Sequence, residues 1–281
     1  MAAYAAARRD FLRSVQNPDG GWGFFPGKQS WLEPTAYATL ALHGDAAADR
    51  AWRLVRSWQL PDGSWPASAQ AREPHWTTAL AITLHTARKV HDDPFRRGVQ
   101  WLLGVNGTEN SWAFRVANFI RPHVVEIDPS FKAWPWRPGT SSWVEPTAHS
   151  LVALRRAAPA YGAGAVADRI RDGERMLLER RCSDGGWNYG NRRVLGHTLP
   201  SYPETTAVAL YGLAGNRSGD VAAAVKRARG LLDETRSPLA KAWLALALRT
   251  HGISLPAPAG DPSPDILVAA LETLAAEGLP A

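Results

Sequence analysis

The residues best suited to chemistry lie in and beside a Trp- and Pro-rich segment near the middle of the chain. Trp134, Trp136 and Trp143 stand among Pro and Gly, where helix packing does not demand large aromatic side chains. Rings exposed to a cavity could hold an apolar chain or stabilise a carbocation through their π faces. Asp128 and His149 are close enough in sequence to supply acid–base groups. The alternative is that the segment is a lid packed by its own Trp residues.

A second set of candidates consists of three Glu residues that precede Thr-Ala by the same spacing. They are Glu33, Glu145 and Glu204, in the segments Trp31-Leu-Glu-Pro-Thr-Ala36, Trp143-Val-Glu-Pro-Thr-Ala148 and Tyr202-Pro-Glu-Thr-Thr-Ala207. An acidic residue beside Pro is favoured in the first turn of a helix, where it interacts well with the helix dipole. Three symmetric copies favour such a structural role, at least for Glu33 and Glu204. Glu145 also adjoins the Trp-rich segment, so both roles remain open for it.

These Glu residues belong to an internal repeat. The repeat occurs four times, and each unit has a helix-like segment, a turn and a second helix that begins with Thr-Ala. The turn contains Gly-Trp or Gly-Ser-Trp, except in the third unit, where a Trp-rich segment takes its place. The distance from Trp22 to Thr35 equals the distance from Trp65 to Thr78, thirteen residues. Repeats with a period of about 40 to 60 residues predict a stacked helical array or a closed ring. The helical parts of a degenerate fifth unit follow at 222–248, and 265–276 is predicted to form a terminal helix.

The two helices of each unit differ in charge. The second is rich in Ala, Thr and Leu and almost free of charge, as in 35–42, whereas the first carries Arg on one face, as in 50–56. A helix that is apolar all round is buried on all sides. The pattern therefore predicts an all-α, double-layered α/α toroid around a central cavity. Because each unit needs its neighbours to bury its apolar face, we expect a single domain over 1–281, with an insertion at about 105–143.

Composition narrows the functional classes. The chain has 281 residues, of which 45% are hydrophobic and 21% charged, and a net charge of +6. No run of like charges resembles a nucleic-acid arm, although a basic rim could attract a phosphate. The lone Cys182 excludes an intramolecular disulfide and a Cys-cluster metal site. No stretch of 18 apolar residues could span a membrane, so a cytoplasmic location is expected.

The turns carry a family resemblance. Phe11…Gln16…Gly20-Gly21-Trp22 and Trp52…Gln59…Gly63-Ser64-Trp65 resemble the Gln-Trp repeat of squalene and oxidosqualene cyclases. Protein prenyltransferase β-subunits share the same α/α toroid. The resemblance covers roughly residues 5 to 250 and implies the fold. It also implies that Trp22, Trp65 and Trp187 stiffen the outer wall, with Gln capping helix ends.

The resemblance further implies an acid. Class II terpene cyclases protonate an alkene or epoxide with the central Asp of Asp-X-Asp-Asp-Thr-Ala, and on the Thr-Ala anchor this Asp corresponds to Glu145. The Asp that follows it in the family is replaced by Pro146. The neighbouring carboxylate that tunes the family's acid is therefore missing from the local sequence. Glu145 is the candidate proton donor, and Asp128 is a second candidate catalytic residue.

The sequence thus predicts a metal-independent enzyme of the terpene cyclase type that acts on an isoprenoid or lipid, without cofactor, nucleic-acid partner or transmembrane segment. Metal-ligand spacing is absent, because Cys182 precedes an outer turn and the His residues form no ligand pattern. The alternatives are a non-catalytic toroid that binds a lipid or peptide, and a glycan-active enzyme with Trp platforms and paired carboxylates. The oligomeric state stays open. The candidate substrate-binding residues are Trp31, Trp76, Trp134, Trp136, Trp143, His149 and Tyr202.

Overall fold

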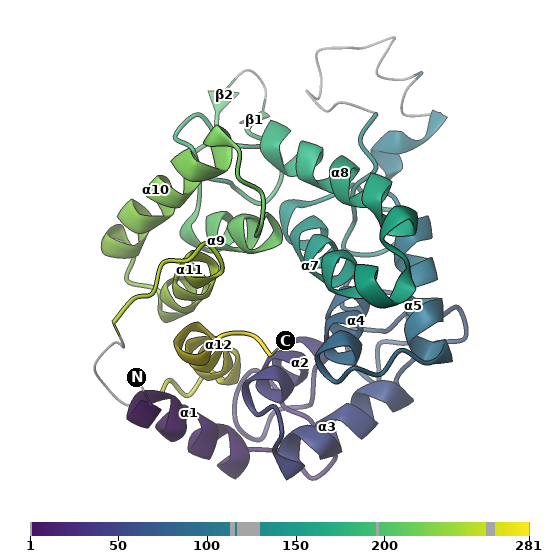
Figure 1. The fold of residues 1–281 in the computed structure, drawn as a ribbon, viewed down its shortest axis with the longest axis vertical. Coiled ribbons are helices and arrows are strands. Elements are labelled where there is room, and N and C mark those ends of the chain that lie inside the picture. The colour runs from purple at the N-terminus through teal and green to yellow at the C-terminus, as the bar shows by residue number, and fades with distance from the viewer. Residues whose placement is uncertain (1, 113–115, 117–129, 195–196, 257–261, 281) are drawn as a thin grey trace.

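The computed structural model describes residues 2–112, 116, 130–194, 197–256 and 262–280. Its α-helices form two concentric layers (Figure 1). The inner layer consists of α2 (Leu32–Ala41), α4 (Thr78–Ala87), α7 (Val144–Tyr161), α9 (Pro203–Gly212), α11 (Pro238–Thr250) and α12 (Ile266–Glu277). The outer layer consists of α1 (Ala2–Ser14), α3 (Ala46–Ser57), α5 (Asp93–Gly104), α8 (Ala163–Glu179) and α10 (Gly219–Glu234).

The inner layer closes on itself. Each inner helix packs against two others in the cycle α2–α4–α7–α9–α11–α12, and α12 returns to α2. Every residue of α4 is buried, whereas α3 buries one face and keeps its Arg residues on the other. This difference follows from the charge pattern of the two helices, and it confirms the predicted all-α toroid. The terminal helix predicted at 265–276 is the sixth inner helix, α12.

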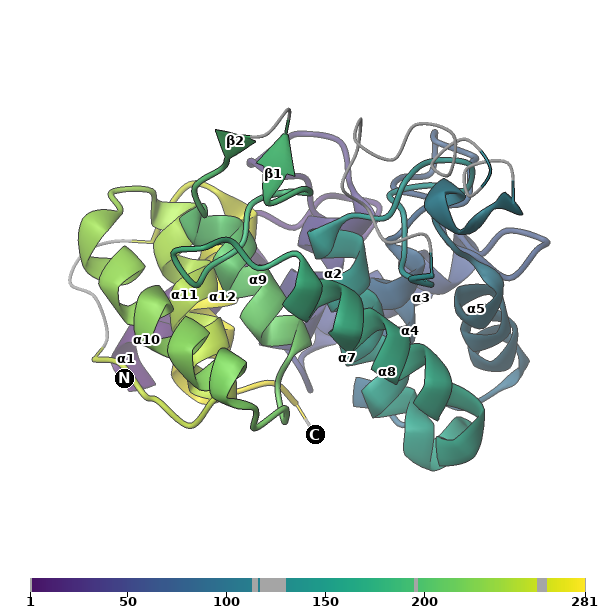
Figure 2. The ribbon, with the colours of Figure 1, turned by 90° about the horizontal axis from the view of Figure 1, so that it is seen from above.

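The connections between the helices make the two faces of the ring different. Because each outer helix returns the chain to the same edge, the inner helices run in one direction and start on one face. A short hairpin of β1 (Arg193–Val194) and β2 (His197–Thr198) lies on this edge just before α9, and the C-terminus lies on the opposite edge (Figure 2). The single-turn 3-10 helix Thr108–Asn110 follows α5. We call the two openings of the inner ring the N-terminal mouth and the C-terminal mouth.

A repeated pair of hydrogen bonds joins the layers. The indole N–H of Trp22 donates to the carbonyl of Leu12 in the preceding outer helix, and its backbone N–H donates to the hydroxyl of Thr35 in the following inner helix. Trp65, Trp134 and Trp187 make the same two bonds, with indole distances of 2.5 to 2.8 Å. All four rings are buried. They satisfy buried polar groups while filling the space between the layers.

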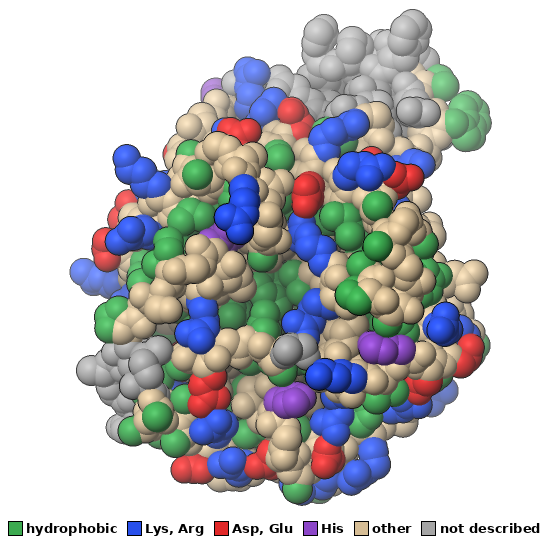
Figure 3. All heavy atoms as spheres, viewed as in Figure 1, with side chains coloured by type: hydrophobic (Ala, Val, Ile, Leu, Met, Phe, Trp, Pro, Cys, Tyr) green, Lys and Arg blue, Asp and Glu red, His purple; other side chains and the backbone are tan. Residues whose placement is uncertain are grey.

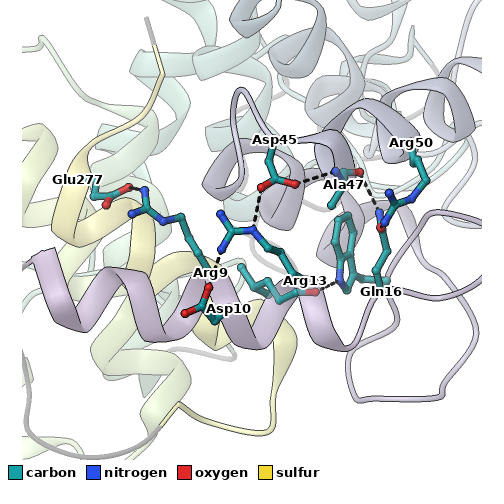
Figure 4. A network of polar contacts seen from close by, with 10 residues as sticks. Arg9, Asp10, Arg13, Gln16, Asp45, Ala47, Arg50 and Glu277 are labelled. Carbon is teal, nitrogen blue, oxygen red and sulfur yellow. Dashed lines mark hydrogen bonds and ion pairs between the residues drawn. The ribbon is translucent and has the colours of Figure 1, made fainter.

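The Gln side chains of the turns join neighbouring units. Gln16 donates to the carbonyls of Gly20 (2.7 Å) and Ala47 (2.8 Å), so the turn after α1 is bound to the first turn of α3. Arg50 donates to the Gln16 side-chain oxygen, and Arg13 donates to Asp45, the N-cap of α3 (2.7 Å; Figure 4). Gln59 repeats these bonds one unit later. Gln thus fixes the start of the following outer helix by donating to a first-turn carbonyl, and not as a helix cap.

Trp134 was predicted to bind substrate, and the structure corrects this. Its ring is 1% exposed, lies in the wall, and donates to the carbonyl of Leu102 at 2.8 Å. It is the wall tryptophan of the third unit. Trp134 precedes Thr147 by thirteen residues, the same spacing as in the first two units, so the sequence already indicated that Trp134 is a wall residue. Helix packing therefore does demand a large aromatic residue at this position, despite the Pro and Gly around it.

We expect Trp134→Phe to lower the free energy of unfolding by about 1–3 kcal/mol, because the buried Leu102 carbonyl loses its donor. Urea denaturation measures this as a lower midpoint at unchanged slope. Trp112→Phe is the matched control, since Trp112 is 78% exposed. Equal midpoints for the two variants would contradict the wall role of Trp134.

Candidate active site at the N-terminal mouth

Three carboxylic acids collect at the N-terminal mouth, one in the first turn of each of three inner helices. Glu33 lies in α2, Glu145 in α7 and Glu204 in α9, and each is partly buried. The residue before each helix makes no side-chain cap bond. The acidic side chain therefore supplies the favourable negative charge at these helix starts. The predicted placement of the three Glu residues is confirmed.

Glu33 and Glu145 point into the same space. One helical turn further along, Tyr37 and His149 share a hydrogen bond of 3.2 Å between Tyr37 Oη and His149 Nδ1. Residues i and i+4 lie on one face of a helix. Glu33 therefore shares a face of α2 with Tyr37, and Glu145 shares a face of α7 with His149, so the bond across the ring directs the two carboxyl-bearing faces toward each other. Asp265, the N-cap of α12, brings a third carboxyl near Glu33.

Burial and charge repulsion keep protons on this pair. Burial, together with repulsion from the carboxylates of Glu145 and Asp265, raises the pKa of Glu33 to about 8. Burial raises the pKa of Glu145 to about 7. Because the two groups interact, the protons belong to the pair and are released in two steps. The carboxylate that raises the pKa of Glu33 thus comes from another helix.

Glu204 has a different environment. Its Oε1 accepts a hydrogen bond from the hydroxyl of Ser237 at 3.0 Å, and Ser237 is the N-cap of α11. The bond connects the first turns of two neighbouring inner helices. This contact agrees with the structural role that the sequence favoured for Glu204, and it makes Glu204 a natural reference for the other two Glu residues.

Below the carboxyls the ring is filled by aromatic side chains, which we call the aromatic floor. It consists of Tyr37, Trp76, His149, Tyr211 and Trp243, all nearly fully buried. His149 is central, with its ring centroid 4.7 Å from that of Trp76 and 5.7 Å from that of Trp243. Burial lowers the pKa of His149 to about 3, so the ring is neutral, and its Nε2 has no partner among the described residues. The floor presents π faces and one neutral base to the space above.

The rim of the mouth carries exposed aromatic side chains. Trp31 is 37% and Tyr202 43% exposed, and Tyr202 lies 5.4 Å from Tyr189, measured between ring centroids. The ring of Trp136 packs edge-on against the ring of Trp76, with 5.5 Å between their centroids. The backbone carbonyl of Trp136 accepts a hydrogen bond from the backbone N–H of Trp76 at 2.9 Å. Trp143 lies against Gly190, where a Cβ would come within 3.0 Å of its ring. An apolar ligand would find ring surface on several sides here.

The structure therefore brings most of the predicted site together. Trp31, Trp76, Trp136, Trp143, His149, Tyr202 and Glu145 share the N-terminal mouth. Their roles toward a ligand stay predictions. Asp128 lies outside the described residues.

Sequence reasoning missed Tyr37, Tyr211, Trp243 and Asp265, and it took Glu33 only for a helix-start residue. The signal for one of them was local. Tyr37 follows Glu33 by four residues, just as His149 follows Glu145. Trp243 and Asp265 come from the fifth unit and the terminal helix, where the repeat is too degenerate to indicate which residues face inward.

The C-terminal mouth has a different chemistry. Figure 3 shows this face hollowed at its centre, with hydrophobic side chains in the hollow and Lys and Arg around it. Basic residues here bind the carbonyl ends of inner helices. His251 donates to the Leu210 carbonyl at 2.8 Å, and Arg155 donates to the carbonyl of Gly212. Cations are favourable at helix C-termini, so these charges serve the ring itself.

Two further properties concern the described residues alone. Within them, no three His, Cys, Asp or Glu side chains come together in a way that could hold a metal ion. None of their helices is long and apolar enough to cross a bilayer.

Comparison with known proteins gives one short sequence match. No protein-family model matches the chain. Drimenyl diphosphate synthase of Streptantibioticus cattleyicolor is 48% identical over 60 residues, which are 20% of this chain and 11% of that protein. The chain thus aligns with a small part of this relative.

Solved structures share the fold over the whole chain. Type II terpene cyclase MstE from Scytonema matches 97% of this chain and 77% of its own, with a TM-score of 0.57 and 18% identity. The ent-copalyl diphosphate synthase from Streptomyces platensis matches 98% of this chain and 48% of its own, with a TM-score of 0.51 and 18% identity. The chain therefore spans about half the length of the latter enzyme. It has the all-helical fold of class II terpene cyclases.

The same fold also occurs in a glycan-active enzyme. Endoglucanase Cel10, a family 8 glycosyl hydrolase from Klebsiella pneumoniae, matches 97% of this chain and 98% of its own, with a TM-score of 0.61 and 14% identity. Fold does not determine chemistry, so the function must be argued from the mouth.

The raised pKa values predict a specific pH dependence of stability. The folded chain holds a proton on Glu33 up to about pH 8, whereas the unfolded chain releases it near 4.5. Raising the pH through this window therefore lowers the free energy of unfolding. Glu33→Gln should flatten this slope, measured by urea denaturation at several pH values. Glu204→Gln is the control: it leaves Glu33 and Glu145 in place, so the free energy of unfolding should depend on pH as in wild type. If Glu33→Gln also shows the wild-type pH dependence, Glu33 is ionised in the folded chain and the prediction is wrong.

Proposed function

We propose that this chain acts on an isoprenoid by metal-independent, class II-like cyclisation, and that Glu145, paired with Glu33, donates the proton. The observation that carries the proposal is the pair of partly buried carboxyls with raised pKa values, one helical turn from Tyr37 and His149 of the aromatic floor. A carboxylic acid that keeps its proton near neutral pH can act as a general acid. The fold of terpene cyclases and the sequence match to drimenyl diphosphate synthase support the substrate class.

The reaction follows from the residues present. The π electrons of a terminal alkene take the proton from the carboxyl, so a C–H bond forms and a carbocation remains on the neighbouring carbon. Further double bonds attack in turn and close rings, until a carbon next to the last cation loses a proton to a water molecule and a new alkene remains. Glu145 then takes a proton back from solvent. Glu145 becomes a carboxylate in the first turn of α7, where the helix N-terminus stabilises negative charge. The π faces of Trp76 and Trp136 stabilise the positive charge.

The mouth also fits this chemistry through its lack of competing charge. His149 is neutral and so does not repel a cation. The floor rings exclude water from below, which protects a carbocation from capture. A non-catalytic toroid that binds a lipid or peptide would need the rim and the floor, but it would gain nothing from a protonated carboxyl pair.

A second candidate function is hydrolysis of a glycan. It is favoured by the match to endoglucanase Cel10, which covers nearly all of both chains. Glycosidases use two carboxylic acids, one of them with a raised pKa, and aromatic platforms bind sugar rings. The exposed Trp31 and Tyr202 are compatible with such a platform. Incubation of the protein with soluble cellulose fragments, analysed for reducing ends, separates this candidate from cyclisation.

Glu145→Gln tests the proton donor, because it keeps the shape of the side chain and removes the proton. Wild type, with a chelator present, should convert a linear prenyl alcohol or prenyl diphosphate into a cyclic isomer that carries deuterium from heavy water. Glu145→Gln should lower the rate by a factor of about 10²–10⁴. Glu204→Gln is the matched control and should retain the wild-type rate. Equal, mild losses in both variants would remove Glu145 from catalysis.

Trp136→Ala and Trp143→Ala test the rim. Each removes ring surface and leaves the carboxyl pair in place, so substrate binding should weaken while the pH dependence of the rate is kept. Equilibrium binding of a non-reactive saturated prenyl analogue measures the first effect. If these variants lose ligand binding and wild type shows no turnover of any prenyl substrate, the chain is a binding toroid.

A further inference from the structure

A buried ion pair lies beside the start of α7. Glu109, in the 3-10 helix after α5, is 0% exposed, and Arg180, the C-cap residue of α8, is 6% exposed. Arg180 Nη2 lies 3.6 Å from Glu109 Oε1. Removing two charges from water costs about as much free energy as their attraction returns, so a buried ion pair is weak evidence for stability. The other contacts of the pair indicate a different role.

Both members of the pair bind the backbone of Ser142. The Ser142 N–H donates to the two carboxylate oxygens of Glu109, at 3.0 and 3.1 Å, and Arg180 Nη1 donates to the Ser142 carbonyl at 2.6 Å. Hydrogen bonds in which one partner is charged are stronger than those between neutral groups. Ser142 is itself buried, so these bonds do not compete with water. We call Glu109, Arg180 and Ser142 the Ser142 clamp.

The backbone of the insertion packs directly onto the clamp. The N–H of Gly107 donates to the carbonyl of Ala133 at 3.0 Å, so two segments of the insertion lie side by side here. A Cβ on Gly107 would clash with Glu109 Oε2 and with the hydroxyl oxygen of Ser142. A residue without a side chain is therefore needed for the chain to pass this close to the carboxylate.

The third unit departs from the first and the fourth at this point. In those two units the Ser before the N-cap residue is held by the Asp of the Gly-Trp turn. Ser30 donates to Asp19 at 2.8 Å, and Ser201 donates to Asp184 at 2.8 Å. Both Asp residues are exposed. The third unit has Phe131 three positions before its wall tryptophan, where the others have Asp. A fully buried carboxylate from the insertion replaces that Asp, and a buried Arg is added.

The clamp lies next to the acid in the sequence. Ser142 comes directly before Trp143 and three positions before Glu145. The N–H of Trp143 donates to the carbonyl of Trp134 at 3.1 Å, but its side chain makes no cap bond to α7. The backbone that enters α7 therefore depends on contacts made just before the helix, and the clamp supplies them.

From these contacts we propose that Glu109 and Arg180 are positioning residues of the N-terminal mouth, which act through the backbone of Ser142 to hold Trp143 at the rim and Glu145 at the start of α7. The inference rests on the function proposed above, because it concerns the same acid. An acid must lie within hydrogen-bond reach of the atom that it protonates, so a small displacement of its helix start lowers the rate.

Amide hydrogen exchange of the full chain tests the clamp without a substrate. The paired variant Glu109→Gln with Arg180→Met nearly keeps the side-chain volumes and leaves neither charge of the pair buried, so circular dichroism should show the wild-type fold. The amides of 142–147 should exchange about tenfold faster or more than in wild type, because the helix start opens more often. Arg155→Met is the matched control, since Arg155 forms an ion pair between the same two helices at the C-terminal mouth. Equal exchange in the paired variant and wild type overturns the proposal.

The rate measured against pH separates positioning from a mere loss of folded protein. Fewer folded molecules would lower the rate by one factor at every pH and would leave KM unchanged. A misplaced Trp143 should raise KM, and water that reaches Glu145 should move its pKa from about 7 toward the ordinary 4.5. Because the acid must be protonated, the rate should then begin to fall at a lower pH. At pH 7 the paired variant should lose a factor of about ten or more, and Arg155→Met less than about twofold.

The outcomes distinguish this proposal from the proposed function. Faster exchange at 142–147 with the KM and pH dependence of wild type would make the clamp purely structural and overturn the positioning role. If wild type converts no prenyl substrate, the proposed function is wrong, and affinity for the saturated prenyl analogue tests the clamp instead. Equal affinity of the paired variant and wild type then refutes the clamp, and absence of analogue binding in wild type refutes both.

Discussion

The pair of hydrogen bonds made by each wall tryptophan is the interaction on which the rest of the structure depends. The indole N–H of Trp22 holds a carbonyl of the outer helix, and its backbone N–H holds Thr35 in the second turn of the inner helix. The same geometry at Trp65, Trp134 and Trp187 fixes where four inner helices begin. Since Glu33, Glu145 and Glu204 each lie two positions before one of these threonines, the wall bonds also fix the carboxyls at the mouth.

Closure of the ring turns this local regularity into an electrostatic property. In a linear array of repeats, Glu33 and Glu145 would lie far apart and would each meet water. In the closed ring they lie near enough for the carboxylate of Glu145 to raise the pKa of Glu33, while burial raises the pKa values of both. The Tyr37–His149 bond one turn below holds the two helix faces together. The part of the raised pKa of Glu33 that comes from Glu145 is thus a consequence of topology, which no local motif of the sequence encodes.

The sequence predicted the architecture because periodicity and charge pattern are local. It indicated the inner and outer helices, the terminal helix and the position of the three Glu residues. It failed at Trp134, because the surrounding Pro and Gly obscured the spacing to Thr147 that was already diagnostic elsewhere. It also failed to pair Glu33 with Glu145, since 112 positions separate them and only the closed ring brings them together. Trp243 and Asp265 were missed for the same reason, because they reach the mouth through long-range packing.

Divergence among similar units produces the asymmetry that a single active site requires. The three helix starts are alike in sequence, yet Glu204 accepts a bond from Ser237, while the carboxylates of Glu145 and Asp265 lie near enough to Glu33 to raise its pKa. A hydroxyl from the neighbouring inner helix therefore distinguishes Glu204 from the other two Glu residues. In a ring of repeats, new sites arise where one unit departs from the pattern, because the remaining units already hold the fold.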